Sequence, residues 1–225
     1  FSLHVLPSET EDREILQIFA RMNSTGVKLN PQELRNAEYL GILKQLIYQL
    51  AYEQLDKWRT WGVFTENNIA RMEEVEETSD YIYMMMNGLK SKSQSQLDNF
   101  YKNYEDHFPY EKVITSRFRT VMEKIDEQLG EDLSNTEFSR KAFTHTLFTF
   151  YYDLMYGINS KLEMKSPNKV PNKTRDAVLD ASNRISKGKI SEELSKLIRG
   201  GTQALNNRNA RLNFLKERLK YAQKQ

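Results

Sequence analysis

The chain has 225 residues, of which 39% are hydrophobic and 28% are charged, as is typical of a globular protein that buries a sizeable core. It contains no cysteine, which excludes a disulfide framework, a thiolate metal site and a cysteine nucleophile. No apolar run approaches the roughly 18 residues of a membrane-spanning helix, so we expect a cytoplasmic protein without a membrane partner.

The charge is distributed unevenly along the chain. Residues 161–225 contain 16 Lys and Arg against 6 Asp and Glu, a net charge of +10, whereas residues 1–160 carry −8. A basic end on an acidic body suggests a polyanionic partner, and the partner that we expect is DNA. The alternative is that these charges are spread over solvated helices. The candidate DNA contacts are Arg199, Arg208, Arg211, Arg218 and Lys220.

The beginning of the chain predicts a strand followed by a helix. Residues 1–8 alternate in the manner of a strand, and residues 9–22 have the apolar spacing of a helix. Gly26 can adopt the left-handed conformation that ends such a helix. Because the first residue is Phe1 and not methionine, we expect the natural chain to begin further upstream.

A second helix is expected over residues 31–57. Asn30 can cap its first turn, Pro31 suits its first position, and the Glu33 side chain can reach back to the cap. Gly41 lies inside this segment, where we expect it to allow close packing against a neighbouring element.

The corner between these two helices carries a residue pattern that packing alone does not require. The pattern Phe-x-Arg-x-Asn-x-x-Gly-x-x-Leu-x-x-x-Glu-Leu is formed by Phe19, Arg21, Asn23, Gly26, Leu29, Glu33 and Leu34. It resembles the helical signature of the GmrSD-type restriction proteins, in which it closes a ParB/sulfiredoxin-like domain. Residues 61–72 and 202–219 also resemble the helical region of these proteins. The resemblance implies that residues 1–57 end the ParB/sulfiredoxin-like α/β domain and that residues 58–225 form a helical domain.

The same resemblance implies nucleotide-dependent restriction of foreign DNA, as part of anti-phage defence. In the family an upstream Asp-Gly-Gln-Gln-Arg motif binds and hydrolyses nucleotide, and many members end in an HNH-type nuclease domain. Neither part occurs in this sequence. We therefore assign no catalytic residue, metal ligand or cofactor to this chain. The nucleoside triphosphate and divalent metal belong to the full-length protein, and a nuclease domain or subunit is a further expected partner.

Two signature residues are candidates for nucleotide binding. Arg21 can offer a charged fork to a phosphate, or to a carboxylate of the missing motif, and Asn23 can contact a polar group. The alternative is that Arg21 pairs with Glu33 or Glu11 while Asn23 holds the turn. Phe19 and Leu29 are expected to be packing residues, and Gly26, Asn30 and Glu33 to be structural.

The remainder predicts a mainly α, multi-helix domain. Thr65 is the expected cap of a third helix, and residues 81–86 are expected to belong to the core. Residues 142–156 are apolar on most sides, which predicts the central helix of the second half. Residues 157–171 form the longest loop. Further helices are expected over 97–108, 110–129, 136–156, 173–186, 191–198 and 202–225, the last with its arginines and lysines facing outward.

Three features invite a catalytic interpretation. Glu73 and Glu77 share a helical face, but no His or Asp has a matching metal-ligand offset within that run, so we expect a solvated acidic face. Asp106 and His107 are similar to the start of an HNH motif, yet helices are expected on both sides, which favours a simple helix end. We expect His145 to be a core histidine.

A different class of function also fits the sequence. The aromatic helix over residues 142–156 and the acidic run near Glu73 are compatible with an all-helical protein-interaction or oligomerisation module without a nucleic-acid role. A contiguous basic surface would favour DNA, and an exposed apolar patch among interspersed charges would favour protein partners, including a second copy of the chain.

Overall fold

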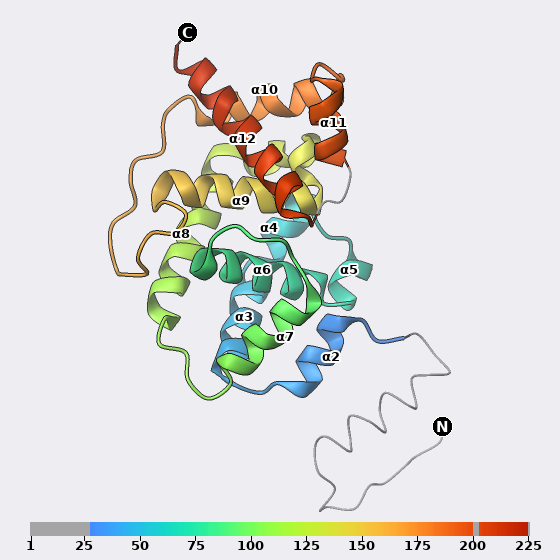
Figure 1. Cartoon of the computed structure of the whole chain (residues 1–225), viewed down its shortest axis with the longest axis vertical. Helices are drawn as coiled ribbons and strands as arrows, with labels where there is room; N and C mark the ends of the chain where they lie inside the picture. Colours follow the sequence, from blue (N-terminus) through green and yellow to red (C-terminus); the bar gives the residue numbers. More distant parts are fainter. Residues whose placement is uncertain (1–27, 200–202, 225) are drawn as a thin grey trace, which may run out of the picture.

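A computed structural model describes residues 28–199 and 203–224, with only the backbone of Arg199. These residues are mainly helical and contain no β-strand (Figure 1). The structure therefore confirms the expected helical class. The strand predicted at residues 1–8 and the helix predicted at 9–22 lie outside the described residues.

Eleven α-helices and two short 3₁₀ helices follow one another in the described residues. The first six α-helices are α2 (Pro31–Glu38), α3 (Ile42–Glu53), α4 (Leu55–Thr60), α5 (Glu66–Ala70), α6 (Glu73–Asn87) and α7 (Gln94–Asn103). The other elements are α8 (Glu111–Leu129), η2 (Gly130–Asn135), η3 (Glu137–Ser139), α9 (Lys141–Met155), α10 (Thr174–Ser186), α11 (Glu192–Arg199) and α12 (Leu205–Ala222).

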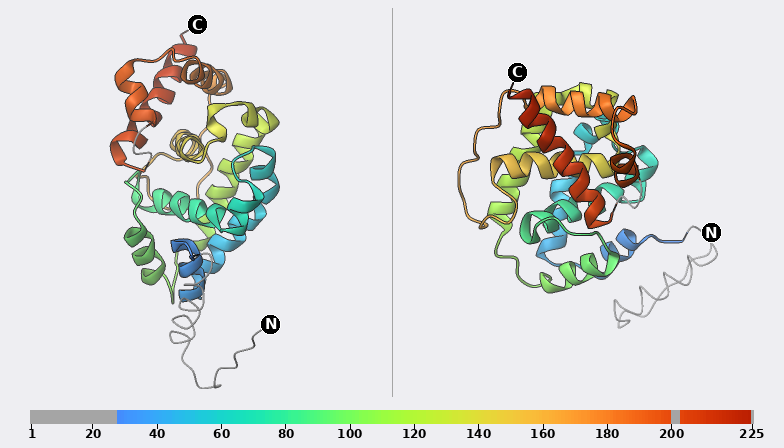
Figure 2. Two further views of the ribbon diagram at one scale, coloured as in Figure 1. Left: turned by 90° about the vertical axis from the view of Figure 1, so that its right-hand side faces the viewer. Right: turned by 45° about the horizontal axis from the view of Figure 1, so that its top comes forward.

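Helix α9 lies in the middle of the molecule, as the 142–156 pattern predicts. It contacts α6 and α8 on one side and α12 on the other (Figure 2). Helices α10 and α11 pack on α12, while α3 packs on α6 and α8. A single cluster of buried apolar side chains extends from Leu43 to Leu219, so α3 shares its core with helices beyond the expected boundary at residue 57.

The expected long helix over 31–57 is wrong, because the chain leaves the helical path between α2 and α3. Tyr39 is extended, and the loop after α7 docks at this point, where Ile42 N donates to the carbonyl of Glu105 over 3.3 Å. A Cβ on Gly41 would lie 1.9 Å from that carbonyl oxygen, so only glycine fits. The expectation that Gly41 permits a close approach is thus confirmed, but at a helix start.

Local capping signals in the sequence are reproduced in the structure. Asn30 and Glu33 form a reciprocal capping box at the start of α2, and Thr65 and Asn68 form a second one at α5. Gly130 has a φ of +46° at the end of α8, the region that glycine adopts without strain.

The core is dense in aromatic side chains. Tyr81 on α6 stacks on Phe148 on α9 with ring centroids 4.3 Å apart, and both are buried. The prediction that the 81–86 segment contributes to the core is confirmed for Tyr81, Ile82, Met84 and Met85.

The long loop between α9 and α10 is held by a buried arginine. Arg117 on α8 donates from Nη2 to the carbonyls of Lys161 and Glu163, each over 2.8 Å, and from Nη1 to the Tyr152 hydroxyl over 2.9 Å. Its guanidinium also lies 4.7 Å from the ring centroid of Tyr156.

Within the described part of the chain, none of the helices has the length and apolar character needed to cross a membrane.

Candidate functional site

A buried ion pair joins α6 and α12, two helices that are far apart in the sequence. Arg208 binds both oxygens of Asp80, with Nη1–Oδ1 at 3.1 Å and Nη2–Oδ2 at 2.5 Å. The side chains are only 3% and 4% exposed, and they are 128 residues apart in sequence. Burial alone would raise the pKa of Asp80, but the hydrogen bonds and positive charge of Arg208, with Lys92 nearby, outweigh burial and lower it.

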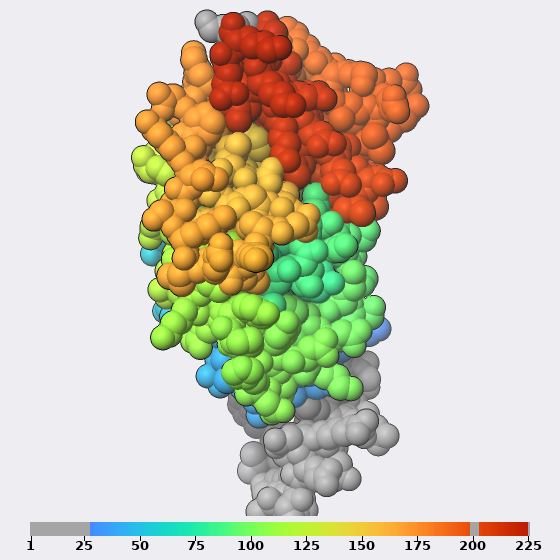
Figure 3. Space-filling view, turned by 60° about the vertical axis from the view of Figure 1, so that its left-hand side comes forward, coloured from blue at the N-terminus to red at the C-terminus, as the bar shows by residue number. Residues whose placement is uncertain are grey.

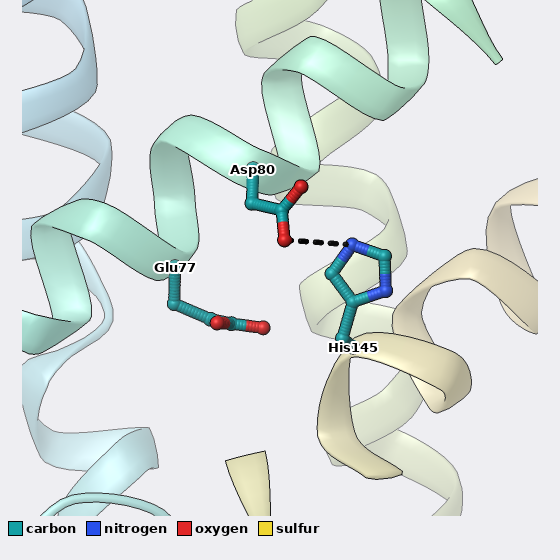
Figure 4. Close-up of side chains that lie close together, drawn as sticks. All are labelled: Glu77, Asp80 and His145. Atoms are coloured by element: carbon teal, nitrogen blue, oxygen red, sulfur yellow. Dashed lines mark ion pairs between the residues drawn. The ribbon is translucent and has the colours of Figure 1, made fainter. Parts of the chain in front are cut away.

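His145, from α9, completes this junction as a neutral side chain. Burial, followed by the nearby charge of Arg208, lowers the pKa of His145 to about 3. Its Nε2 lies 3.2 Å from Arg208 Nη1 and therefore accepts, while Nδ1 lies 3.4 Å from the Thr149 hydroxyl. His145 Nε2 also lies 3.5 Å from Asp80, the contact dashed in Figure 4. Because His145 is neutral, this contact is not an ion pair between two charges. The expected core histidine is confirmed.

A second set of ion pairs connects α2 to the same region of α6. Arg35 Nη2 lies 3.0 Å from one oxygen of Glu76, and Lys92 Nζ lies 2.8 Å from the other. Lys92 also lies 3.8 Å from Glu77 Oε2. Burial alone would lower the pKa of Lys92, but Glu77 and the other nearby carboxylates outweigh burial, and the pKa is raised overall. The ammonium therefore stays charged. We call these six charged side chains the buried charge network: Arg35, Glu76, Glu77, Asp80, Lys92 and Arg208.

Glu77 is the least satisfied member of the network. It is only 5% exposed, and its Oε1 has no hydrogen-bond partner. Burial raises the pKa of Glu77 to about 7, against the opposing charge of Lys92. This carboxyl therefore changes its charge near neutral pH.

Glu77 also lines a cleft of about 300 Å³, which we call the polar cleft. The other lining residues come from the starts of α2, α7 and α9, the end of α5, the first turn of α6, the loop after α6 and the segment before α12. They are Asn30, Pro31, Gln32, Arg71, Glu73, Glu76, Lys92, Gln94, Lys141 and Gln203. Among the residues that the structure describes, none of the lining side chains is aromatic. The cleft therefore suits a polar ligand better than one that stacks on a ring.

Glu77, Asp80 and His145 point toward one another from α6 and α9, with potential ligand atoms within 4.8 Å (Figure 4). A carboxylate–imidazole set of this kind can hold a divalent metal. Here, however, both Asp80 oxygens and the acceptor nitrogen of His145 face the guanidinium of Arg208. A metal ion would have to expel that cation. The donor set therefore fits an internal ion pair better than a metal site.

The signature residues fall into two groups. Phe19, Arg21, Asn23 and Gly26 lie outside the described residues, so their roles stay predictions. Asn30 and Glu33 form the α2 capping box, while Leu29 is half-buried. Glu33, one of the partners considered for Arg21, lies 3.2 Å from Arg71.

The expected outward orientation of the terminal-helix cations is wrong for two of them. Arg208 is buried against Asp80, and Arg211 is buried with its Nε 3.0 Å from the Thr146 hydroxyl. Arg218 is mostly buried and lies 2.7 Å from Asp180, whereas Lys220 is exposed. The side chain of Arg199 is outside the described set. The helical spacing of Arg208 and Arg211 with Leu212 and Leu215 was the signal for this buried face.

The expected solvated acidic face on α6 is also wrong in part, because Glu74 and Glu77 are buried. The groups around Glu77 come from α9, α12 and the loop after α6, so the spacing of residues within the acidic run could not predict the network. Asp106 and His107 are exposed in the loop after α7, as expected for a helix end.

Comparison of the chain with protein-family models, with curated proteins and with solved structures finds no match.

Proposed function

We propose that this chain is the helical part of a GmrSD-like defence protein, acting in the cytoplasm, where it couples an upstream nucleotide-binding domain to a DNA-contacting C-terminal region. The observation that supports the coupling is the buried charge network. It begins at Arg35 on α2, directly after the signature, and ends at Arg208 on α12, in the basic part of the chain.

The network is reinforced by backbone contacts between the loop after α6 and the segment before α12. Lys92 N donates to the Gln203 carbonyl over 3.0 Å, and Leu205 N donates to the Ser91 hydroxyl over 3.0 Å. Gln203 in turn accepts from Arg208 over 2.7 Å. A change at the start of α2 or in the polar cleft therefore has a continuous path of packed polar groups to α12.

The DNA-contacting surface in this proposal is the basic face formed by loop 157–173 and the end of α12. Figure 3 has these two segments on one face of the molecule. Their exposed lysines are Lys161, Lys165, Lys169, Lys173, Lys220 and Lys224. Phosphate contacts require exposed cations. We therefore propose these lysines as the DNA contacts in place of the buried Arg208 and Arg211.

The test replaces Lys165, Lys169 and Lys220 with glutamine and measures duplex-DNA binding by fluorescence anisotropy across a salt series. We expect weaker binding and a shallower salt dependence, by about 0.9 in the log–log slope for each DNA phosphate that the variant no longer neutralises. A matched triple variant at the exposed Lys187, Lys189 and Lys196 changes the net charge equally elsewhere. Equal losses in the two variants, or unchanged binding in the first, would contradict the proposed surface.

A protein-interaction function has one specific observation in its favour. Leu34, Leu40 and Ile42, near the α2–α3 corner, are 45%, 59% and 38% exposed. If this corner is an interface with a nuclease subunit or a second copy, Leu40→Glu should leave the fold intact and abolish association. Sedimentation velocity distinguishes the cases, because a chain that is monomeric with or without the substitution excludes self-association.

A further inference from the structure

A second cleft lies where α12 meets the end of α6 and the loop after α9. Its volume is about 410 Å³, and Figure 3 has the three segments on one face of the molecule. Four asparagines of the described chain line it, and they come from all three segments: Asn87, Asn159, Asn209 and Asn213. All four are exposed, so a ligand in the cleft can reach their side chains. We call this hollow the asparagine cleft.

The carboxamides of these asparagines are largely unused by the fold. Within the described residues, the side chains of Asn159, Asn209 and Asn213 make no hydrogen bond. Asn87 donates from Nδ2 to the Tyr83 carbonyl over 3.1 Å, which leaves its oxygen available. Because a carboxamide presents a donor and an acceptor side by side, the cleft suits a ligand whose edge carries both.

The charged groups of the cleft disfavour a cationic ligand. Asp153 is already engaged, because Oδ1 accepts from the Ile158 amide over 2.8 Å and Oδ2 lies 2.6 Å from Lys216 Nζ. Lys90, in contrast, is exposed and has no ion-pair partner among the described residues. A ligand with a polar edge and a nearby negative charge therefore fits this lining best.

The cleft also continues the basic face of the proposed DNA site along α12. Asn209, Asn213, Lys216 and Lys220 follow one another at intervals of four, three and four residues, which places them along one side of the helix. Lys220 is one of the lysines proposed to contact DNA phosphates. A strand that lies along this side of α12 therefore brings its bases to the asparagine cleft.

We propose that the asparagine cleft binds one unpaired base of the DNA whose backbone lies on the basic face, an inference that rests on the proposed DNA-binding function. Asparagine forms paired hydrogen bonds with adenine, so adenine is the base that we expect to bind best. Leu89, Ile158 and Leu212 supply apolar contacts for the flat faces of a base. A base inside an intact duplex must first leave the stack, so a base that is already unpaired binds at lower cost.

The experiment measures fluorescence anisotropy of three labelled duplexes of one sequence with the full chain. The first duplex is fully paired, the second carries one extra, unpaired adenine, and the third has an abasic site in place of that adenine. We expect the wild type to bind the adenine duplex about tenfold more tightly than the abasic duplex, as for one paired contact to a base. Because both have the same backbone bulge, the ratio isolates the base from the bend.

Variants of the lining make the result specific. The double variant Asn209→Ala/Asn213→Ala should lose the preference for adenine and bind the fully paired duplex as the wild type does. Both positions are exposed, and alanine favours a helix, so the fold is kept. Asn159 has a φ of 65°, which glycine adopts freely, so Asn159→Gly removes a carboxamide without strain and should reduce the preference. The matched control Asn206→Ala, exposed on α12 outside the described lining, should keep it.

Equal wild-type affinity for the adenine and abasic duplexes would overturn the proposal. A preference that survives in the double variant, or that is lost equally in Asn206→Ala, would overturn it as well. Circular dichroism of each variant ensures that a lost preference reflects the cleft and not the fold.

The fully paired duplex separates failure of this site from failure of the proposed function. If the wild type binds that duplex but does not distinguish adenine from the abasic site, the cleft is not a base site and the DNA-binding proposal stands. If the wild type binds none of the three duplexes, the DNA-binding proposal fails, and this inference fails with it.

Discussion

Two buried arginines in this molecule are stabilised in opposite ways. Arg208 on α12 is neutralised by Asp80, with His145 and Lys92 nearby, at the edge of the polar cleft. Arg117 on α8 instead donates to two loop carbonyls and a tyrosine hydroxyl and lies against the Tyr156 ring. The first arrangement joins distant helices through paired charge, whereas the second fastens one loop through neutral acceptors. The difference predicts that, of these two regions, only the one around Arg208 responds to pH, and that the loss of one charged group costs more stability there than at Arg117.

The largest expected effect is at Asp80. Asp80→Asn keeps the shape of the side chain but leaves the Arg208 guanidinium buried without a counter-charge. We expect a loss of about 3–5 kcal/mol in the free energy of unfolding, measured with urea. A loss below about 1 kcal/mol would mean that Arg208 does not depend on this pair, and the contrast with Arg117 would fail.

The pH response of Glu77 should be the next largest effect. Its folded pKa of about 7 lies above the ordinary 4.5, so the folded state holds the proton more tightly than the unfolded state. This contribution to stability is complete below about pH 4.5 and is lost as the pH rises to 7 and above. His145 opposes this trend below pH 6.5, because its lowered pKa favours the unfolded state there.

The contribution of Glu77 is isolated by comparing the wild type with Glu77→Gln. We expect the difference in unfolding free energy, wild type minus variant, to fall by up to about 3 kcal/mol between pH 4.5 and pH 8. Urea denaturation across this range measures the difference. A difference that is constant with pH would show that Glu77 has an ordinary pKa.

The loop anchor should have a smaller and more local effect. Arg117→Met removes the donors to the carbonyls of Lys161 and Glu163, and we expect a loss of about 1–3 kcal/mol with faster proteolysis within 157–173. Arg119→Met, at a partly exposed position on the same helix, is the matched control. If the two variants are cleaved at the same rate, Arg117 does not hold the loop.

The smallest expected change in unfolding free energy is at an ion pair on the surface. Arg119 and Glu53 are paired at the surface, with side chains 40% and 30% exposed. Glu53→Gln should change the free energy of unfolding by less than about 1 kcal/mol, and added salt should reduce the change further. A larger effect, determined by the same urea method, would remove the distinction between surface and buried pairs.

The sequence predicted local structure where a few neighbouring residues determine it. The caps at Asn30 and Thr65 depend on contacts within four residues, and both occur in the structure. The break at Gly41 could not be predicted, because it depends on the Glu105 carbonyl, which the fold brings from the loop after α7.

The charge network was missed for a related reason. Asp80 meets Arg208 across 128 residues, and no spacing rule connects them. The burial of Arg208 could nevertheless have been predicted from the sequence, because Arg208 precedes Leu212 by one helical turn and so lies on the apolar face of α12. A charged residue on an apolar stripe predicts a buried partner of opposite charge, and Asp80 is that partner.

The Asp80–Arg208 pair couples α6 to the C-terminal helix α12, so that the two helices open and unfold together. Hydrogen exchange measured by mass spectrometry on the wild type, Asp80→Asn and Glu53→Gln tests this coupling most directly. We predict that Asp80→Asn accelerates amide exchange in both α6 and α12, while Glu53→Gln leaves both unchanged. Wild-type exchange throughout α12 in Asp80→Asn would contradict the claim.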